Sequence, residues 1–455
     1  MRRTWIAVGL GVPVAVGLVI FRWHTHSNEP GESHAGSAAI VEAAAPAVVA
    51  ATAGKALPLL AGLDLTKIAL SDAGATAPLP DGKTARLTID AKLQSVANAV
   101  MARYRLPEAA VVMIDTASGS VLVYASHIEH GSMRDLCAEA TAPAASVFKI
   151  VTGASLVDTA GLSPDERACY SGGEQRIRES DLVADSKKDK WCTTLGGAMG
   201  RSINTVFARF ALQYLSAPAI EQMAKSLGFG APLAFDVPVQ PSALKVPSDP
   251  LGFARTAAGF WNTTLSPFHA AWLSATMARG GEPVRPHIVS EVVSDSGKIV
   301  WTASGPKALE RAVKPHVAHA VATMMGSTVT DGTSFRAFHD PEGRPFLADV
   351  PIAGKTGTLT DAAAQRYYTW FSGFSHATKP ASNPAAEQVG GEVDKPASPP
   401  VAIGVLVVNT PIWTIKANVL AREVLRAYFA EHNEKGVSMP NLDEGNRSVA
   451  RKKRK

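Results

Sequence analysis

The chain has 455 residues, of which 46% are apolar and only 19% are charged, and its formal net charge is +5. That length allows up to about three domains, and the composition excludes a disordered or supercharged chain. The excess charge equals that of the last five residues, 451–455, so no basic stripe within a domain indicates nucleic-acid binding. Three cysteines without a Cys-x-x-Cys pair exclude a disulfide scaffold and a cysteine-based zinc site.

The N-terminus predicts a single membrane anchor. Two arginines precede the uncharged segment 5–21, which would extend about 25 Å as a helix. Trp5 and Trp23 flank it, where indole rings favour the membrane interface, and the arginines predict cytoplasmic residues 1–4. The remainder would then be periplasmic or extracellular, tethered to the plasma membrane. A cleavable signal peptide is the alternative, although no small-x-small cleavage site follows directly, and a buried soluble helix is another.

Composition divides the rest of the chain. Residues 22–83 are rich in alanine and proline without a clear period, which indicates a weakly structured stalk. Residues 84–432 carry the strand and helix patterns of one large domain. Within it, residues 376–400 form a polar, Pro- and Gly-rich flexible insert, and residues 433–455 form a basic, disordered tail.

The elements of the large domain favour an α+β fold. A short strand ends at Ile89, Asp90 is a candidate N-cap, and apolar residues then recur at helical spacing. Runs 110–114 and 121–124 read as a β-hairpin, because turn residues separate two β-rich runs. Two further strands, 367–372 and 401–408, precede a closing amphipathic helix over 416–428.

The first chemical motif is Ser146-Val-Phe-Lys149. The run after it is helical, so Lys149 can reach the Ser146 hydroxyl from one turn away. A serine becomes a nucleophile when an adjacent base takes its proton, and a lysine with a lowered pKa can be that base. Two other Ser-x-x-Lys copies begin at Ser242 and Ser304, but prolines flank the first and Gly305-Pro306 interrupts the second.

Two further motifs are weak when taken alone. Ser202-Ile-Asn204 lies at a helix edge, where it could relay a proton and clamp a peptide amide, or could simply cap the helix. Lys355-Thr-Gly-Thr358 follows an apolar strand. Its lysine and hydroxyls suit a carboxylate, and its glycine permits close backbone approach.

Together and in this order, the three motifs resemble the active site of the serine penicillin-recognising enzymes. The resemblance covers about residues 84–432. This segment resembles the transpeptidase domain of penicillin-binding proteins. Asp331-Gly-Thr333 before the Lys-Thr-Gly segment adds to it. It implies an antiparallel five-stranded sheet flanked by helices, with an all-helical subdomain, and neither a cofactor nor a metal.

The resemblance also implies residue roles. The nucleophile is Ser146, which forms an acyl-enzyme with a peptidoglycan stem peptide or a β-lactam antibiotic, and Lys149 is the general base. The proton relay and amide clamp are Ser202 and Asn204. The substrate carboxylate meets Lys355, whose motif supplies further binding groups in Thr356, Gly357 and Thr358. The oxyanion hole consists of the backbone N–H groups of Ser146 and Thr358.

The resemblance implies a D,D-transpeptidase; a D,D-carboxypeptidase, a non-enzymatic penicillin sensor and a structural partner of other wall-synthesis proteins remain open. No glycosyltransferase domain fits before residue 84. The polar segment between Cys169 and Cys192 precedes Ser202, so outside the cytoplasm these cysteines are candidates for a disulfide. Cys137 would remain a small buried residue.

Overall fold

The structure is a computed structural model that describes residues 58–173, 176–376, 398–432, 434 and 436–441. The predicted anchor 5–21, the cytoplasmic residues 1–4, most of the insert 376–400 and most of the basic tail lie outside the described residues. Among those that are described, no helix is both long and apolar enough to cross a membrane.

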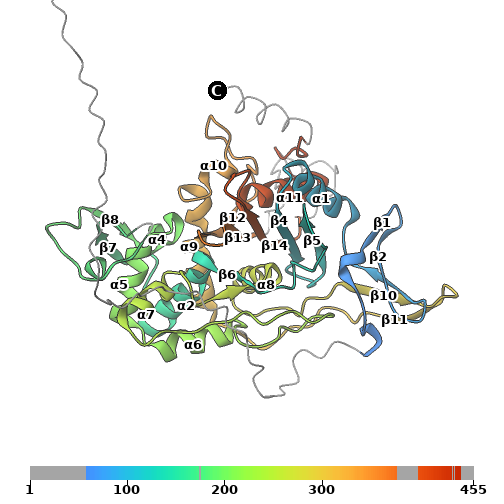
Figure 1. The fold of residues 1–455 in the computed structure, drawn as a ribbon, viewed down its shortest axis with the longest axis horizontal. Coiled ribbons are helices and arrows are strands. Elements are labelled where there is room, and N and C mark those ends of the chain that lie inside the picture. The colour runs from blue at the N-terminus through green and yellow to red at the C-terminus, as the bar shows by residue number, and fades with distance from the viewer. Residues whose placement is uncertain (1–57, 174–175, 377–397, 433, 435, 442–455) are drawn as a thin grey trace, which may run out of the picture. The chain divides into compact units, whose positions relative to one another are not determined.

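A five-stranded sheet, hereafter the main sheet, forms the centre of the large domain (Figure 1). Its strands are ordered β12-β13-β14-β4-β5, and every neighbouring pair is antiparallel, which confirms the predicted sheet. Its strands are β4 (Glu108–Asp115), β5 (Val121–Ile128), β12 (Ile352–Asp361), β13 (Arg366–Ser375) and β14 (Val401–Asn409).

The predicted hairpin forms between β4 and β5. The Asp115 carboxylate accepts hydrogen bonds from the N–H groups of Ala117 and Ser118, and Gly119 adopts a φ of +80° that favours glycine. The turn therefore has a local cause, which the sequence already carries.

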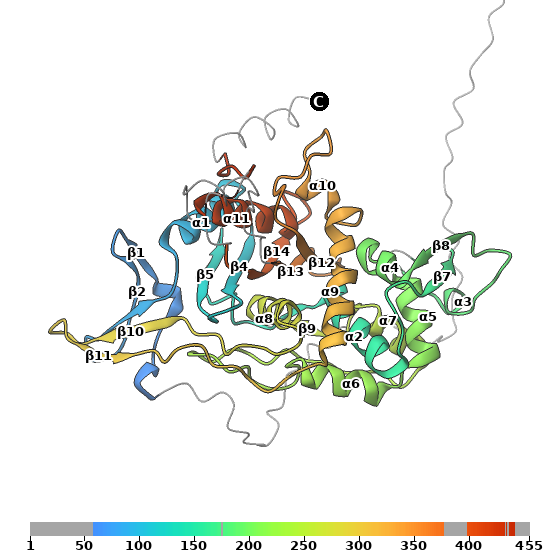
Figure 2. The ribbon, with the colours of Figure 1, turned by 180° about the vertical axis from the view of Figure 1, so that it is seen from behind.

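Helices cover both faces of the main sheet. On one face lie α1 (Ala91–Arg103) and α11 (Ala417–Glu431), and on the other lies α8 (Pro267–Ala278) (Figures 1 and 2). Strand β14 is buried along its whole length because its alternate side chains enter different cores. Ile403 belongs to the core under α1 and α11, whereas Leu406 belongs to the core that includes α8. Asp90 caps α1 as predicted, by accepting from two backbone N–H groups.

A mainly helical region packs beside β12. Its longer helices, α2 and α9, share a core with the sheet. The region also contains two short antiparallel pairs, β6–β9 and β7–β8, so the expectation of an all-helical subdomain is wrong in detail. Its elements are β6 (Ala142–Pro143), α2 (Lys149–Ala160), β7 (Arg167–Tyr170), α3 (Glu179–Leu182), β8 (Trp191–Thr194), α4 (Leu195–Arg201), α5 (Asn204–Tyr214), α6 (Ala217–Ser226), α7 (Pro250–Ala257), β9 (Thr264–Leu265), α9 (Pro315–Thr330) and α10 (Phe335–Phe338).

The structure contains a second five-stranded sheet, ordered β1-β2-β3-β10-β11. The expectation of a weakly structured stalk over 22–83 is therefore wrong for residues 58–83, which the structure describes. The pattern of this sheet is weak in sequence because the buried positions of β2 are alanines, and because β3 pairs with β10 some 200 residues later. The elements concerned are two short 3-10 helices (Pro58–Leu60 and Leu65–Lys67), β1 (Ala69–Ser71), β2 (Gly74–Pro78), β3 (Thr84–Leu87), β10 (Val289–Val293) and β11 (Ile299–Thr302).

Candidate active site

Ser146 and Lys149 form a close pair at the beginning of α2. Ser146 lies on a single 3-10 turn (Ala145–Phe148) that runs directly into the helix. The Nζ atom of Lys149 lies 2.8 Å from Ser146 Oγ, 2.6 Å from Asn204 Oδ1 and 2.5 Å from the backbone oxygen of Ala258. The last two oxygens can only accept hydrogen bonds. A neutral amine has two N–H groups for them and one lone pair left for the serine proton.

The environment of Lys149 favours that neutral form. Burial lowers the pKa of its amine well below the usual value, and the positive charge of Lys355 adds to the effect. Lys149 is fully buried and has no carboxylate partner among the described residues. Its hydrogen-bond partners are neutral, so they hold the amine in place without the negative charge that would raise its pKa again.

Ser202 occupies the junction between two helices. It is the C-cap of α4 and adopts a left-handed conformation, with φ 58° and ψ 42°, directly before Ile203 and the first residue of α5, Asn204. A non-glycine residue in this region costs roughly 1–2 kcal/mol, so the surrounding packing must hold it there. This conformation differs from the N-cap alternative and places the hydroxyl 2.9 Å from Lys355 Nζ.

Lys355 projects from β12, the edge strand of the main sheet. Its amine donates to Ser202 Oγ and, at 2.8 Å, to the backbone oxygen of Thr356. The side chain is fully buried, and burial lowers the pKa of its amine to about 7. Two chains of contacts, Ser146–Lys149–Asn204 and Ser202–Lys355, therefore lie side by side, with Asn204 and Ser202 only two residues apart.

These groups surround one cavity of about 420 Å³. Ser146, Ser202, Asn204 and the backbone of Gly357 reach its wall, whereas the two lysines lie buried behind it. The lining residues are Ser146, Tyr170, Arg201, Ser202, Ile203, Asn204, Thr333, Thr356, Gly357, Thr358, Thr369, Trp370, Lys416 and Asn418.

The structure thus brings all eight predicted catalytic and binding residues to one place. It adds residues that the three motifs did not indicate, notably Tyr170, Arg201 and Lys416. The hydroxyl of Thr333 lies 2.5 Å from the hydroxyl of Thr356. The Asp331-Gly-Thr333 motif therefore indicated, from sequence, one further residue of the cavity wall. The oxyanion-hole assignment stays a prediction, although Ser146 and Thr358 both reach the cavity.

The two other Ser-x-x-Lys copies lie outside the cavity. Ser242 is buried, and its hydroxyl lies 2.7 Å from Nδ1 of His269, whose Nε2 contacts the backbone oxygen of Leu227 at 2.7 Å. Ser304 is exposed in an irregular segment. Neither has the helical setting that joins Ser146 to Lys149.

The buried His269 makes stability depend on pH. Burial lowers the pKa of its imidazole from 6.5 to about 4, so the folded protein excludes a proton that the unfolded chain binds. Its stabilising contribution is present above pH 6.5 and is lost as the pH falls towards 4, by about 3 kcal/mol in total. The unfolding free energy, measured with urea, should differ less between pH 7 and pH 4.5 in His269→Gln than in the wild-type protein. Equal differences in the two proteins would contradict this assignment.

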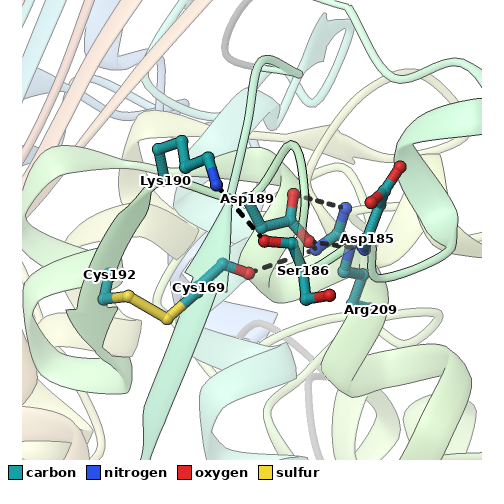
Figure 3. The surroundings of a disulfide bond; sticks show 7 residues. All are labelled: Cys169, Asp185, Ser186, Asp189, Lys190, Cys192 and Arg209. Carbon is teal, nitrogen blue, oxygen red and sulfur yellow. Dashed lines mark hydrogen bonds and ion pairs between the residues drawn. A yellow bond between two sulfur atoms is a disulfide. The ribbon is translucent and has the colours of Figure 1, made fainter.

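The Cys169–Cys192 disulfide joins β7 to β8 (Figure 3). Between the two cysteines, the partly buried Asp189 forms a 2.7 Å ion pair with Arg209 of α5, which also donates to the backbone oxygen of Cys169. The Arg209 guanidinium lowers the pKa of Asp189 to about 2. Tyr170, next to Cys169, lines the cavity, so this hairpin contributes directly to the site.

We expect the Cys169→Ser/Cys192→Ser variant to lose about 3 kcal/mol of unfolding free energy, because the loop closed by the disulfide gains freedom in the unfolded chain. Reduced wild-type protein should match it in chemical denaturation. Its penicillin acylation rate should fall less than tenfold, because Arg209 still holds the loop. Free thiols at both positions in protein isolated from an oxidising compartment would contradict the disulfide, and Cys137→Ser is the control.

A serine hydroxyl beside a buried lysine amine one helical turn away is the arrangement of those serine acyl-transfer proteins in which such a lysine activates the nucleophile. The family model described as "Penicillin binding protein transpeptidase domain" matches residues 109–383, and the chain belongs to this family.

Individual relatives are distant. The chain is 26% identical over 249 residues to the peptidoglycan D,D-transpeptidase PbpA of Mycolicibacterium smegmatis, a match that covers 53% of this chain and 48% of that protein. The chain thus spans about half the length of the curated relatives it matches. Among solved structures, PBPA from Mycobacterium tuberculosis is similar with a TM-score of 0.58 and 21% identity, covering 77% of this chain and 80% of that one.

A second solved structure gives the same fold. The D,D-transpeptidase domain of a peptidoglycan glycosyltransferase from Eggerthella lenta matches with a TM-score of 0.58 and 21% identity, over 77% of this chain and 83% of that chain. These likenesses support the α+β architecture described above.

Proposed function

We propose that the chain is a penicillin-sensitive serine D,D-transpeptidase that cross-links peptidoglycan stem peptides. The observation that carries the proposal is the contact of the Ser146 hydroxyl with the buried, proton-poor amine of Lys149, on the wall of a cavity that the other two motifs complete. The family membership and the PbpA relatives, which are named peptidoglycan D,D-transpeptidases, support the same reaction.

The reaction divides into two acyl transfers. The lone pair of Lys149 Nζ takes the Ser146 proton as Oγ attacks the carbonyl of the penultimate D-alanine. Backbone N–H groups of Ser146 and Thr358 would stabilise the oxyanion. The terminal D-alanine leaves with a proton relayed from Lys149 through Ser202. An amine of a second stem peptide then attacks the acyl-enzyme, the ester bond to Ser146 Oγ breaks, and the amine's proton passes through Lys149 to that oxygen. Attack by water instead would make the protein a D,D-carboxypeptidase.

The proposed location is outside the cytoplasm, with segment 5–21 as a single-pass anchor in the plasma membrane, residues 22–57 as its tether and residues 433–455 as a basic tail. A disulfide between Cys169 and Cys192 supports an oxidising compartment. The positive charge before segment 5–21 supports a cytoplasmic N-terminus. Other wall-synthesis proteins are possible partners in that compartment, and a reporter fused after residue 90 would test the topology.

The test is covalent labelling of the full-length protein with a fluorescent penicillin, followed by peptide mass spectrometry. A structural neighbour from M. tuberculosis is an imipenem acyl-enzyme complex, so a β-lactam is a suitable probe. We expect one adduct per chain, on Ser146. Incubation with a D-Ala-D-Ala peptide and an acceptor amine then separates transpeptidation from hydrolysis by the product formed. Absence of both labelling and turnover would favour the structural-partner alternative, and labelling without turnover would favour a sensor.

A further inference from the structure

Three cationic side chains lie at the cavity, Lys355 behind its wall and Arg201 and Lys416 on it. Lys355 is fully buried behind the wall and already donates to Ser202 Oγ and to the Thr356 backbone oxygen. Because burial lowers the pKa of Lys355 to about 7, this amine is only partly charged at neutral pH in the empty site. Arg201, on the wall, is committed to an ion pair with Asp331 at 2.9 Å.

Lys416 is the remaining cation on the wall. Among the described residues it forms no ion pair, and its amine lies 5.6 Å from the centroid of the Trp413 ring. An ammonium group at this distance from an indole face is held by a cation–π attraction that leaves its N–H groups available to a ligand. Lys416 is exposed, so a ligand in the cavity can reach it without rearrangement of the core.

The fold fixes Lys416 beside the carboxylate-binding hydroxyls expected from the Lys-Thr-Gly motif. It is the N-cap residue of α11, and the next N–H group, of Ala417, donates to Thr369 Oγ1 at 3.1 Å. Thr369 pairs directly with Thr358 across β13 and β12, and both threonines line the cavity. The beginning of α11 is therefore tied to the strand position opposite Thr358.

Asn418, two residues after Lys416 in α11, links the beginning of this helix to the segment that follows α9. It is buried, lines the same cavity, and donates to Ser334 Oγ at 3.1 Å. Ser334 follows Thr333, whose hydroxyl contacts Thr356. Hydroxyls from β12, an amide from α11 and an unpaired ammonium thus line the same cavity, and together they suit a carboxylate better than a neutral group.

We propose that Lys416 is a substrate-binding residue that recognises the C-terminal carboxylate of the acyl donor and complements Lys355. The inference rests on the proposed transpeptidase function. Its consequence is a preference for donors with a free C-terminus over donors in which that carboxylate is blocked. The β-lactam carboxylate would occupy the same position.

The experiment compares Lys416→Gln with wild-type full-length protein on two acyl donors, a D-Ala-D-Ala peptide and its C-terminal amide. We expect kcat/KM for the free carboxylate to fall about three- to tenfold, the range for an exposed charge, while kcat/KM for the amide stays unchanged. The second-order acylation rate with fluorescent penicillin should fall similarly, and the difference from wild type should shrink in 0.5 M salt. Lys416→Arg should restore most of the rate.

Lys314→Gln is the control. Lys314 is also an N-cap lysine of a long helix, α9, without a side-chain cap bond, but it does not line the cavity and, unlike Lys416, forms an ion pair with Asp158 at 2.8 Å. It should alter neither donor. If Lys416→Gln loses kcat/KM equally on both donors, or on neither, the proposal for Lys416 is wrong. Labelling of the wild-type protein at Ser146 would still support the proposed function in that case. A wild-type protein that neither labels nor turns over would remove both, and thermal unfolding of Lys416→Gln checks that the fold is intact.

Discussion

Replacement of Ser146 with alanine is expected to abolish covalent labelling by penicillin, with no signal above that of heat-denatured protein. The change removes the hydroxyl that contacts the Lys149 amine, while the cavity and that amine remain. We expect the thermal unfolding temperature to stay close to that of the wild-type protein, because a hydroxyl at a cavity wall makes a small contribution to packing. Gel fluorescence and intact-mass measurement give the result directly.

The control for this experiment is Ser304→Ala, which alters another Ser-x-x-Lys copy in an exposed segment. Its labelling should equal that of the wild-type protein. Labelling that persists in Ser146→Ala, with an adduct mapped to Ser242 or Ser304, would contradict the nucleophile assignment. Because Ser242 is buried against His269, an adduct there would also require the local fold to open.

Removal of the Lys149 amine should give the second large effect, a fall in the acylation rate of about 10²–10⁴-fold. Lys149→Met keeps most of the side-chain volume but cannot accept the serine proton. Lys149→Arg keeps a positive charge that cannot be released near neutral pH, so it should fail to a similar extent. Stopped-flow or time-resolved labelling measures the rate constant for each variant.

Two features make this test discriminating. Both variants disturb the contacts to Asn204 Oδ1 and the Ala258 backbone oxygen, so thermal unfolding must show that each variant is folded. If the amine acts only by holding these oxygens in place, Lys149→Arg should keep substantial activity. An acylation rate within tenfold of wild type in Lys149→Arg would therefore contradict the general-base role.

Local signals in the sequence predicted the elements whose causes are local. Asp90 caps its helix through neighbouring N–H groups, and Asp115 closes its own hairpin turn. The second sheet escaped prediction for a physical reason: β3 and β10 pair across about 200 residues, and a small residue such as Ala75 gives little hydrophobic pattern. The strand expected to end at Ile89 corresponds to β3, but only its pairing with β2 and β10 shows that it belongs to a second sheet.

The same distinction applies to the site. Ser146, Ser202 and Lys355 belong to motifs with fixed spacing, so their convergence could be expected from the resemblance. Tyr170 and Lys416 reach the cavity only through tertiary packing, the first from a disulfide-linked hairpin and the second from the beginning of α11. Neither lies in a motif, and the sequence around each reads as an ordinary strand or helix end.

The pairing of early with late strands has a consequence for how the chain reaches its native state. During synthesis from the N-terminus, β3 can pair with β2 but lacks its second neighbour until β10 emerges, which takes roughly 10 to 40 s at about 5–20 residues per second. The wait of β4 for β14 is longer still. Meanwhile the apolar β4–β5 hairpin would be exposed to aggregation, because non-local pairing is slow. A holding chaperone would therefore raise the yield of folded protein more than it would raise its final stability.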